Sequence, residues 1–154
     1  MSKVKSVYQT SITLTVIGLL IISALMAPML NLIPYVKAAP ENWWNLDWQY
    51  RKAITKDHNK VAADLSNFPI LIDITDSDLA IKAQLDGDDI AFVDNAGTKL
   101  NHEIEIYDSH TGHLVAWVNV PSLSSIFDTQ IYIYYGNAAA ENQENPTAVW
   151  DSQY

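Results

Sequence analysis

Two glutamates that lie two residues apart are the side chains of this sequence best suited to chemistry. Glu103 and Glu105 lie in the stretch HEIEIY, where polar and apolar residues alternate as they do in a half-buried β-strand. Residues two apart on a strand share a face, so their carboxylates are expected roughly 6.5–7 Å apart along it. Glycoside hydrolases use two carboxylates at about this range. The alternation with Ile104 and Ile106, expected on the core side, favours a solvated outer face; a polar binding patch is the third interpretation.

Aspartates in two loop segments form a second candidate site. The stretch DSD contains Asp76 and Asp78, and the stretch DGDD contains Asp86, Asp88 and Asp89. Calcium binds about six to eight such oxygens, so the DGDD group is a candidate calcium site. Its spacing departs from the D-x-D-x-D-G loop, and no glutamate follows at the required distance. Turn formation and helix capping are the alternative roles of these aspartates.

Aromatic residues could form a surface for sugar rings, whose apolar faces pack against indole and phenol rings. Trp43 and Trp44 lie beside a linker and outside any strand alternation. Tyr132 and Tyr134 share the outward face predicted for the stretch IYIYYGN. These four residues are the aromatic candidates for ligand binding; for Trp43 and Trp44 the alternative is a role in plugging one end of the sandwich. Trp117 lies within an alternating stretch, where a large aromatic side chain is expected to fill the space between two sheets.

Composition and charge exclude several classes of function. The chain has no cysteine, which excludes disulfides, a thiolate nucleophile and a cysteine-based zinc site. From Ala39 onward it has 6 basic and 18 acidic side chains, so nucleic acid and anionic lipid are disfavoured partners. No G-x-S-x-G elbow, P-loop or dinucleotide fingerprint is present. The histidines are expected in exposed turns rather than as metal ligands: His58, His102, His110 and His113.

Residues 1–38 are predicted to be an export segment. Positive charge in MSKVKS precedes a stretch without charged residues from Ser6 to Val36. Its most apolar part, Ile12 to Leu30, has 19 residues, between a signal-peptide core of roughly 7–15 and a spanning helix of about 20. A cleaved signal peptide and an uncleaved N-terminal helix that anchors the chain in the membrane are both open. Either one places the rest of the chain outside the cytoplasm, secreted or anchored at the cell surface.

After a linker and aromatic entry at 39–48, the hydrophobic pattern has a period of two residues. The alternating stretches are QYRKAITK, FPILIDI, DIAFVD, KLNHEIEIYD, HLVAWVNVP and DTQIYIYYGN. Turn residues separate them at spacings of about 8–12 residues. We therefore expect an all-β fold over residues 49–137, an antiparallel β-sandwich of jelly-roll or concanavalin-like type with about seven or eight strands. The stretch DSDLAIKAQLDG is the expected short helix, capped by Ser77 or Asp78 and ended by Gly87.

The last alternating stretch also predicts which side chains enter the core. Ile131, Ile133 and Tyr135 are expected on the core face because two isoleucines mark it, and Tyr132 and Tyr134 on the other face. Residues 138–154 form a polar tail that turns aromatic. This tail is either an edge strand of the same sandwich or the start of a following domain.

Six stretches, in order, resemble the family called domain of unknown function 2341. They are WQYRKAIT, NFPILIDI, DGDDIAFVDNAGTKLNHEIEIYD, GHLVAWVNVPSLSS, DTQIYIYYGN and AVWDSQY. The family occurs on exported archaeal and bacterial proteins, commonly just before a laminin-G or concanavalin-like domain. The resemblance implies an exported β-sandwich module with no established activity, and it carries over no catalytic residues.

These observations predict a non-catalytic, extracytoplasmic module of a cell-surface or secreted protein. Adhesion or binding of a glycan or surface protein is the expected role, with membrane contact only through an uncleaved N-terminal segment. A glycoside hydrolase that uses Glu103 and Glu105 is one alternative. A structural subunit of a surface assembly, anchored by the N-terminal helix, is the other. No cofactor is expected beyond calcium at the DGDD loop.

Overall fold

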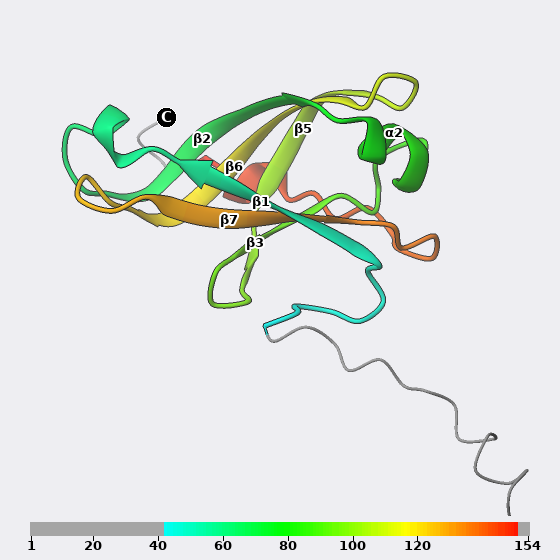
Figure 1. Ribbon diagram of the computed structural model, residues 1–154, viewed down its shortest axis with the longest axis horizontal. Coiled ribbons are helices and arrows are strands. Elements are labelled where there is room, and N and C mark those ends of the chain that lie inside the picture. Colours follow the sequence, from blue (N-terminus) through cyan, green and yellow to red (C-terminus); the bar gives the residue numbers. More distant parts are fainter. Residues whose placement is uncertain (1–41, 151–154) are drawn as a thin grey trace, which may run out of the picture. The chain divides into compact units, whose positions relative to one another are not determined.

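Seven strands form two antiparallel sheets in the computed structural model, which describes residues 42–150 (Figure 1). The four-stranded sheet has the order β1 (Tyr50–Lys56), β7 (Thr129–Tyr135), β3 (Ala91–Asp94) and β4 (Lys99–Leu100). The three-stranded sheet has the order β2 (Leu65–Thr75), β6 (His113–Leu123) and β5 (His102–Asp108). The prediction of an all-β fold with antiparallel sheets is confirmed, whereas the expected N-terminal helix lies outside the described residues.

Helical segments in the described part are short. They are η2 (His58–Lys60), α2 (Ser77–Lys82) and η3 (Pro146–Ala148). Helix α2 lies within the predicted stretch, but its N-cap is Asp76, whose side chain accepts a hydrogen bond from the backbone NH of Asp78. The helix ends at Lys82 rather than at Gly87. Among the described residues, no helix has the length and apolar character needed to cross a membrane.

The core lies between the inner faces of the two sheets. Its fully buried residues include Ile72 and Val118 from the three-stranded sheet, and Phe92 and Ile133 from the four-stranded sheet. The predicted core face of β7 is confirmed, because Ile131, Ile133 and Tyr135 are all buried in this cluster. The alternation of strand residues therefore supplies the inward apolar surface, which stabilises the fold by about 25 cal/mol per Å² removed from water.

The outer face of the four-stranded sheet is covered as well. The segment before β1 places Trp43, Trp44 and Trp48 against Tyr134, which has no solvent exposure. Tyr134 therefore lies on the face of β7 opposite the core, as the alternation predicts, but the chain's own tryptophans bury it there. Tyr132, on the same face, is partly buried.

A β-bulge in β5 reverses the faces of the strand. Ile104 is opposite Ala116, whereas Ile106 is opposite Val115, so Glu105 is the extra residue between them. Beyond the bulge, Ile106 points outward and is 50% exposed, and the core-side expectation for it is wrong. Tyr107 turns inward instead, and its hydroxyl donates a hydrogen bond to the carbonyl of Leu79.

His102 is a core residue rather than the exposed turn histidine expected from the sequence. It is fully buried, with its ring 5.2 Å from that of Phe92. Neither ring nitrogen makes a hydrogen bond of good geometry with a described residue. Burial lowers the pKa of His102 to about 4. The nearby backbone groups of Leu100 and Ile90 act in the opposite direction and raise this pKa, but by less than burial lowers it.

His102 should make the free energy of unfolding depend on pH. In the unfolded chain its pKa is about 6.5, so the unfolded state binds the proton first as the pH falls. Stability is lost as the pH falls from about 6.5 toward 4, by about 2 kcal/mol between pH 7 and pH 5. Urea melts at pH 7 and pH 5 measure this loss of unfolding free energy. In His102→Leu the loss should be smaller than in the wild type by about 2 kcal/mol. His110→Gln, a change at a side chain that is 94% exposed, should match the wild type. Equal pH profiles for wild type and His102→Leu would contradict the assignment.

Candidate functional site

The outer face of the three-stranded sheet carries the strongest candidate site. In β6, Ala116 and Val118 are the neighbours of Trp117, and both are fully buried in the core. Trp117 therefore points outward, between Leu71 on β2 and Glu103 on β5. The expectation that Trp117 fills the space between the sheets is wrong. The polar residues at alternate positions of the same strand could have indicated this orientation.

A second tryptophan lies beside Trp117, in the segment that follows η3. The two ring centroids of Trp117 and Trp150 are 5.2 Å apart, with 57° between the ring planes. The segment before Trp150 is held on the sheet because Val149 is fully buried and its carbonyl accepts a hydrogen bond from Asn119 Nδ2 at 2.9 Å. Trp150 itself is 36% exposed. The sequence did not single out this pair, because its members come from different elements.

Glu103 and Glu105 orient the two indole rings. Trp150 Nε1 donates to Glu103 Oε2 at 2.9 Å, and Trp117 Nε1 donates to Glu105 Oε1 at 3.0 Å. Both glutamates, which were expected on one face of the strand, meet the outward tryptophans there. We call Leu71, Glu103, Glu105, Trp117 and Trp150 together the tryptophan face. It offers two partly exposed rings, each held by a hydrogen bond to a carboxylate.

The other aromatic candidates form a packed cluster. The ring of Tyr134 lies 5.3 Å from that of Trp43 and 5.7 Å from that of Trp44, in edge-on contacts. The hydroxyl of Tyr134 accepts hydrogen bonds from the backbone NH of Trp44 and from Arg51 Nη1, both at 3.0 Å. The guanidinium of Arg51 lies 4.6 Å from the ring centre of Tyr132. These rings contact one another and Arg51, which is the arrangement expected of an end plug.

The DGDD loop places Asp89 in the interior. Asp89 has no solvent exposure, and its Oδ1 accepts a hydrogen bond from the backbone NH of Gln84 at 2.8 Å. Its Oδ2 accepts from the backbone NH groups of Gly136 and Asn137, at 2.6 and 3.0 Å. Both carboxylate oxygens of Asp89 therefore bind backbone donors. The other two candidate calcium ligands, Asp86 and Asp88, contact each other: the backbone NH of Asp88 donates to Asp86 Oδ1 at 3.3 Å, a longer bond than those to Asp89.

A different group of ligating side chains comes together at the end of the domain near η2. The possible ligand atoms of Asp57, His58 and Asp128 all lie within 4.8 Å of one another. The interactions within the protein also account for this arrangement: Asp57 caps η2, and Asp128 Oδ1 lies 2.6 Å from His58 Nδ1. Sequence reasoning missed the group because Asp128 is 70 residues from His58 along the chain.

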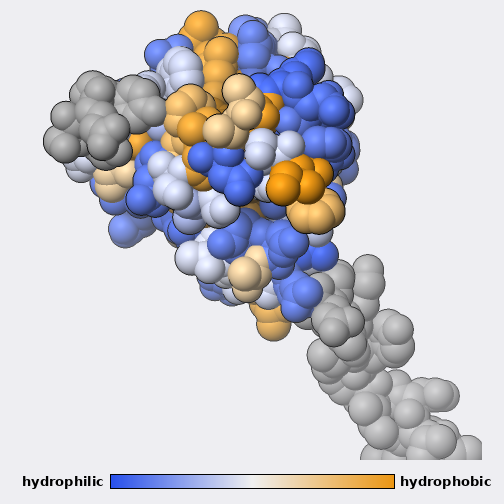
Figure 2. Space-filling model, turned by 90° about the vertical axis from the view of Figure 1, so that its left-hand side faces the viewer, coloured by the Kyte–Doolittle hydropathy of each residue, from blue (hydrophilic) through white to orange (hydrophobic). Residues whose placement is uncertain are grey.

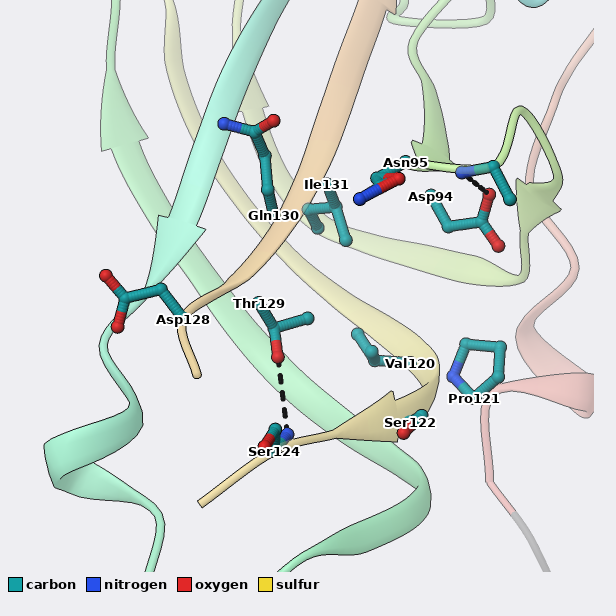
Figure 3. A pocket seen from close by; sticks show the side chains of 11 residues that line it. Asp94, Asn95, Val120, Pro121, Ser122, Ser124, Asp128, Thr129, Gln130 and Ile131 are labelled. Carbon is teal, nitrogen blue, oxygen red and sulfur yellow. Dashed lines mark hydrogen bonds between the residues drawn. The ribbon is translucent and has the colours of Figure 1, made fainter. Parts of the chain in front are cut away.

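A groove of about 320 Å³ lies between the β3–β4 turn and the neighbouring ends of β6 and β7 (Figure 3). Asp94 Oδ1 accepts hydrogen bonds from the backbone of Ala96 and Thr98, and Thr129 Oγ1 accepts from the backbone NH of Ser124. These polar groups build the turns around the groove. Figure 2 shows the end of the domain that carries the β6–β7 turn, with hydrophobic side chains in separate patches among hydrophilic ones.

A family model matches part of the chain. Residues 86–152 match the model of a family described as a domain of unknown function (DUF2341). This match confirms the resemblance found in the sequence over that range, while the stretches WQYRKAIT and NFPILIDI precede it. No curated protein and no solved structure gives a significant match.

Replacing Asp89 should destabilise the fold far more than replacing its neighbour. Asp89→Asn removes an acceptor that faces backbone NH groups, so the free energy of unfolding should fall by about 2–4 kcal/mol. Asp88→Asn, at the adjacent and less buried carboxylate, should change it by less than about 0.5 kcal/mol. Urea melts in the presence of EDTA measure both, and equal losses in the two variants would contradict the role of Asp89.

Asp88→Asn also tests the calcium prediction. A site that uses Asp86, Asp88 and Asp89 would raise the melting temperature when calcium is added, because a ligand that binds only the folded state stabilises it. Asp88→Asn should then remove that rise. An unchanged melting temperature of the wild type in millimolar calcium would end the calcium prediction.

Proposed function

We propose that this chain, matched over residues 86–152 by a family of undefined function, is a non-catalytic, extracytoplasmic module that binds a glycan on its tryptophan face. The observation that carries the proposal is the pair of partly exposed rings of Trp117 and Trp150, 5.2 Å apart on the outside of a sheet.

The chemistry of this face suits a sugar chain. The apolar CH faces of sugar rings pack against indole, and two neighbouring indoles can contact a chain at more than one point. The hydrogen bonds to Glu103 and Glu105 hold the two rings in place before any ligand arrives. This preorganisation lowers the entropic cost of binding.

The environment of the glutamates favours binding over hydrolysis. A glycosidase needs one carboxylic acid kept protonated by a desolvating pocket. Glu105 is exposed, and both glutamates already accept hydrogen bonds from indole NH groups. The extracytoplasmic location is supported by the charge pattern of the N-terminal sequence, which lies outside the described residues.

Glycan binding should depend on both tryptophans. In a glycan array followed by titration of the best ligand, Trp117→Ala and Trp150→Ala should each weaken binding about tenfold, since one ring contact is worth about 1.4 kcal/mol. Phe127→Ala removes an aromatic side chain that is 73% exposed in the β6–β7 turn, and it should bind like the wild type. Circular dichroism checks that each variant is folded. A glycan ligand whose affinity is unchanged in both tryptophan variants would place the site elsewhere.

The hydrolase alternative predicts a different result in the same preparation. Wild-type protein would release reducing sugar from a polysaccharide panel, and the Glu103→Gln/Glu105→Gln double variant would not. We expect no release from either protein. Turnover that disappears in the double variant would replace binding with catalysis as the function of this face.

A further inference from the structure

The tryptophan face lies on a sheet whose strands contain no positively charged residue. The described strands β2, β5 and β6 contain neither lysine nor arginine, but four acidic residues: Asp73, Glu103, Glu105 and Asp108. The ammonium group of Lys56, from β1, reaches the β2 edge and donates to the backbone carbonyl of Leu71 at 2.9 Å. The chain from Ala39 onward is also strongly acidic. A ligand on the β5 side of this face, where Glu103 and Glu105 lie, therefore meets negative charge, while Lys56 lies at the opposite β2 edge.

The hydrogen-bonding groups of the tryptophan face further restrict the chemistry of a ligand that can bind there. Both indole NH groups donate to glutamates, so the rings offer a ligand their π faces. Each glutamate uses one oxygen for an indole, and no described residue donates a hydrogen bond to Glu103 Oε1 or Glu105 Oε2. Around the two rings the face thus offers acceptors and negative charge to a ligand. Such a site favours a ligand that brings donors and positive charge.

From this charge complementarity we infer that the ligand is a polysaccharide of amino sugars with free amines, of the glucosamine type. This inference rests on the proposed function and narrows its ligand class. In such a polymer, an ammonium group lies next to the apolar face of the same sugar ring. The ring packs on an indole while the ammonium lies near a carboxylate and the π face of the second indole. A uronic acid polymer would bring its carboxylates against Glu103 and Glu105 and is disfavoured.

Titration calorimetry with three soluble β-1,4-linked oligomers of equal length tests the ligand class on the full chain. The oligomers are glucosamine, its N-acetylated form and glucose, with an oligogalacturonate as the anionic probe. The glucosamine oligomer should bind about tenfold more tightly than the two neutral ones at low salt, and the oligogalacturonate most weakly. The preference should shrink in 0.5 M salt because the ammonium–carboxylate attraction is screened.

Glutamine variants test whether the two carboxylates set this preference. Glu103→Gln and Glu105→Gln keep a carbonyl oxygen that can accept the indole NH but remove one negative charge. Each should reduce the ratio of glucosamine to glucose affinity about threefold or more, and the double variant should bring it close to one. Asp47→Asn makes the same change in net charge at an exposed residue of another segment, and it should keep the wild-type ratio.

The outcomes separate the inference from the proposed function. Equal affinity for the glucosamine and glucose oligomers would overturn the inference while glycan binding stands. No binding of any oligomer, with folded protein, would count against the proposed function itself and remove the basis of the inference. A preference for glucosamine that survives in the double variant would also overturn the inference, because the carboxylates would not be its cause.

Discussion

The buried carboxylate of Asp89 is the interaction on which the arrangement of this domain depends. It accepts backbone hydrogen bonds from Gln84, before β3, and from Gly136 and Asn137, after β7. The backbone carbonyl of Asp89 also accepts the indole NH of Trp48 at 2.6 Å, which ties down the segment before β1. One residue therefore joins three segments in a chain that has no cysteine. A residue with a side chain at position 136 would meet the ring of Tyr50, so this junction requires glycine.

The direction that the chain takes at this junction determines the proposed site. Beyond Asn137 the tail runs along β5, where Glu144 Oε2 accepts from the backbone NH of Ile104 and Asn145 NH donates to the carbonyl of His102. These bonds satisfy backbone groups of an edge strand that would otherwise be open to pairing with another chain. They also bring Trp150 beside Trp117. Protection of the edge and assembly of the tryptophan face are thus two results of one packed tail.

Local alternation was sufficient to predict the strands and most of their faces. It placed Ile131, Ile133 and Tyr135 in the core, and it put Glu103 and Glu105 on one side of their strand. It could not predict the bulge in β5, because one extra residue changes the pairing without a glycine or proline to mark it. The burial of Tyr134 was equally hidden from the local pattern. It depends on tryptophans about 90 residues earlier that fold over the sheet.

The position of the two aromatic groups relative to the family match favours one of them as the site. Trp117 and Trp150, with Glu103 and Glu105, all lie within residues 86–152. Trp43 and Trp44 lie before that range, and their rings pack on Tyr134. The tryptophan face also uses Leu71 on β2, which precedes that range, but both of its rings and both of its carboxylates come from the matched region, whereas both tryptophans of the Trp43–Trp44 cluster lie outside it. The tail that completes the tryptophan face is part of the same match, together with β5 and β6, which carry Trp117 and both glutamates.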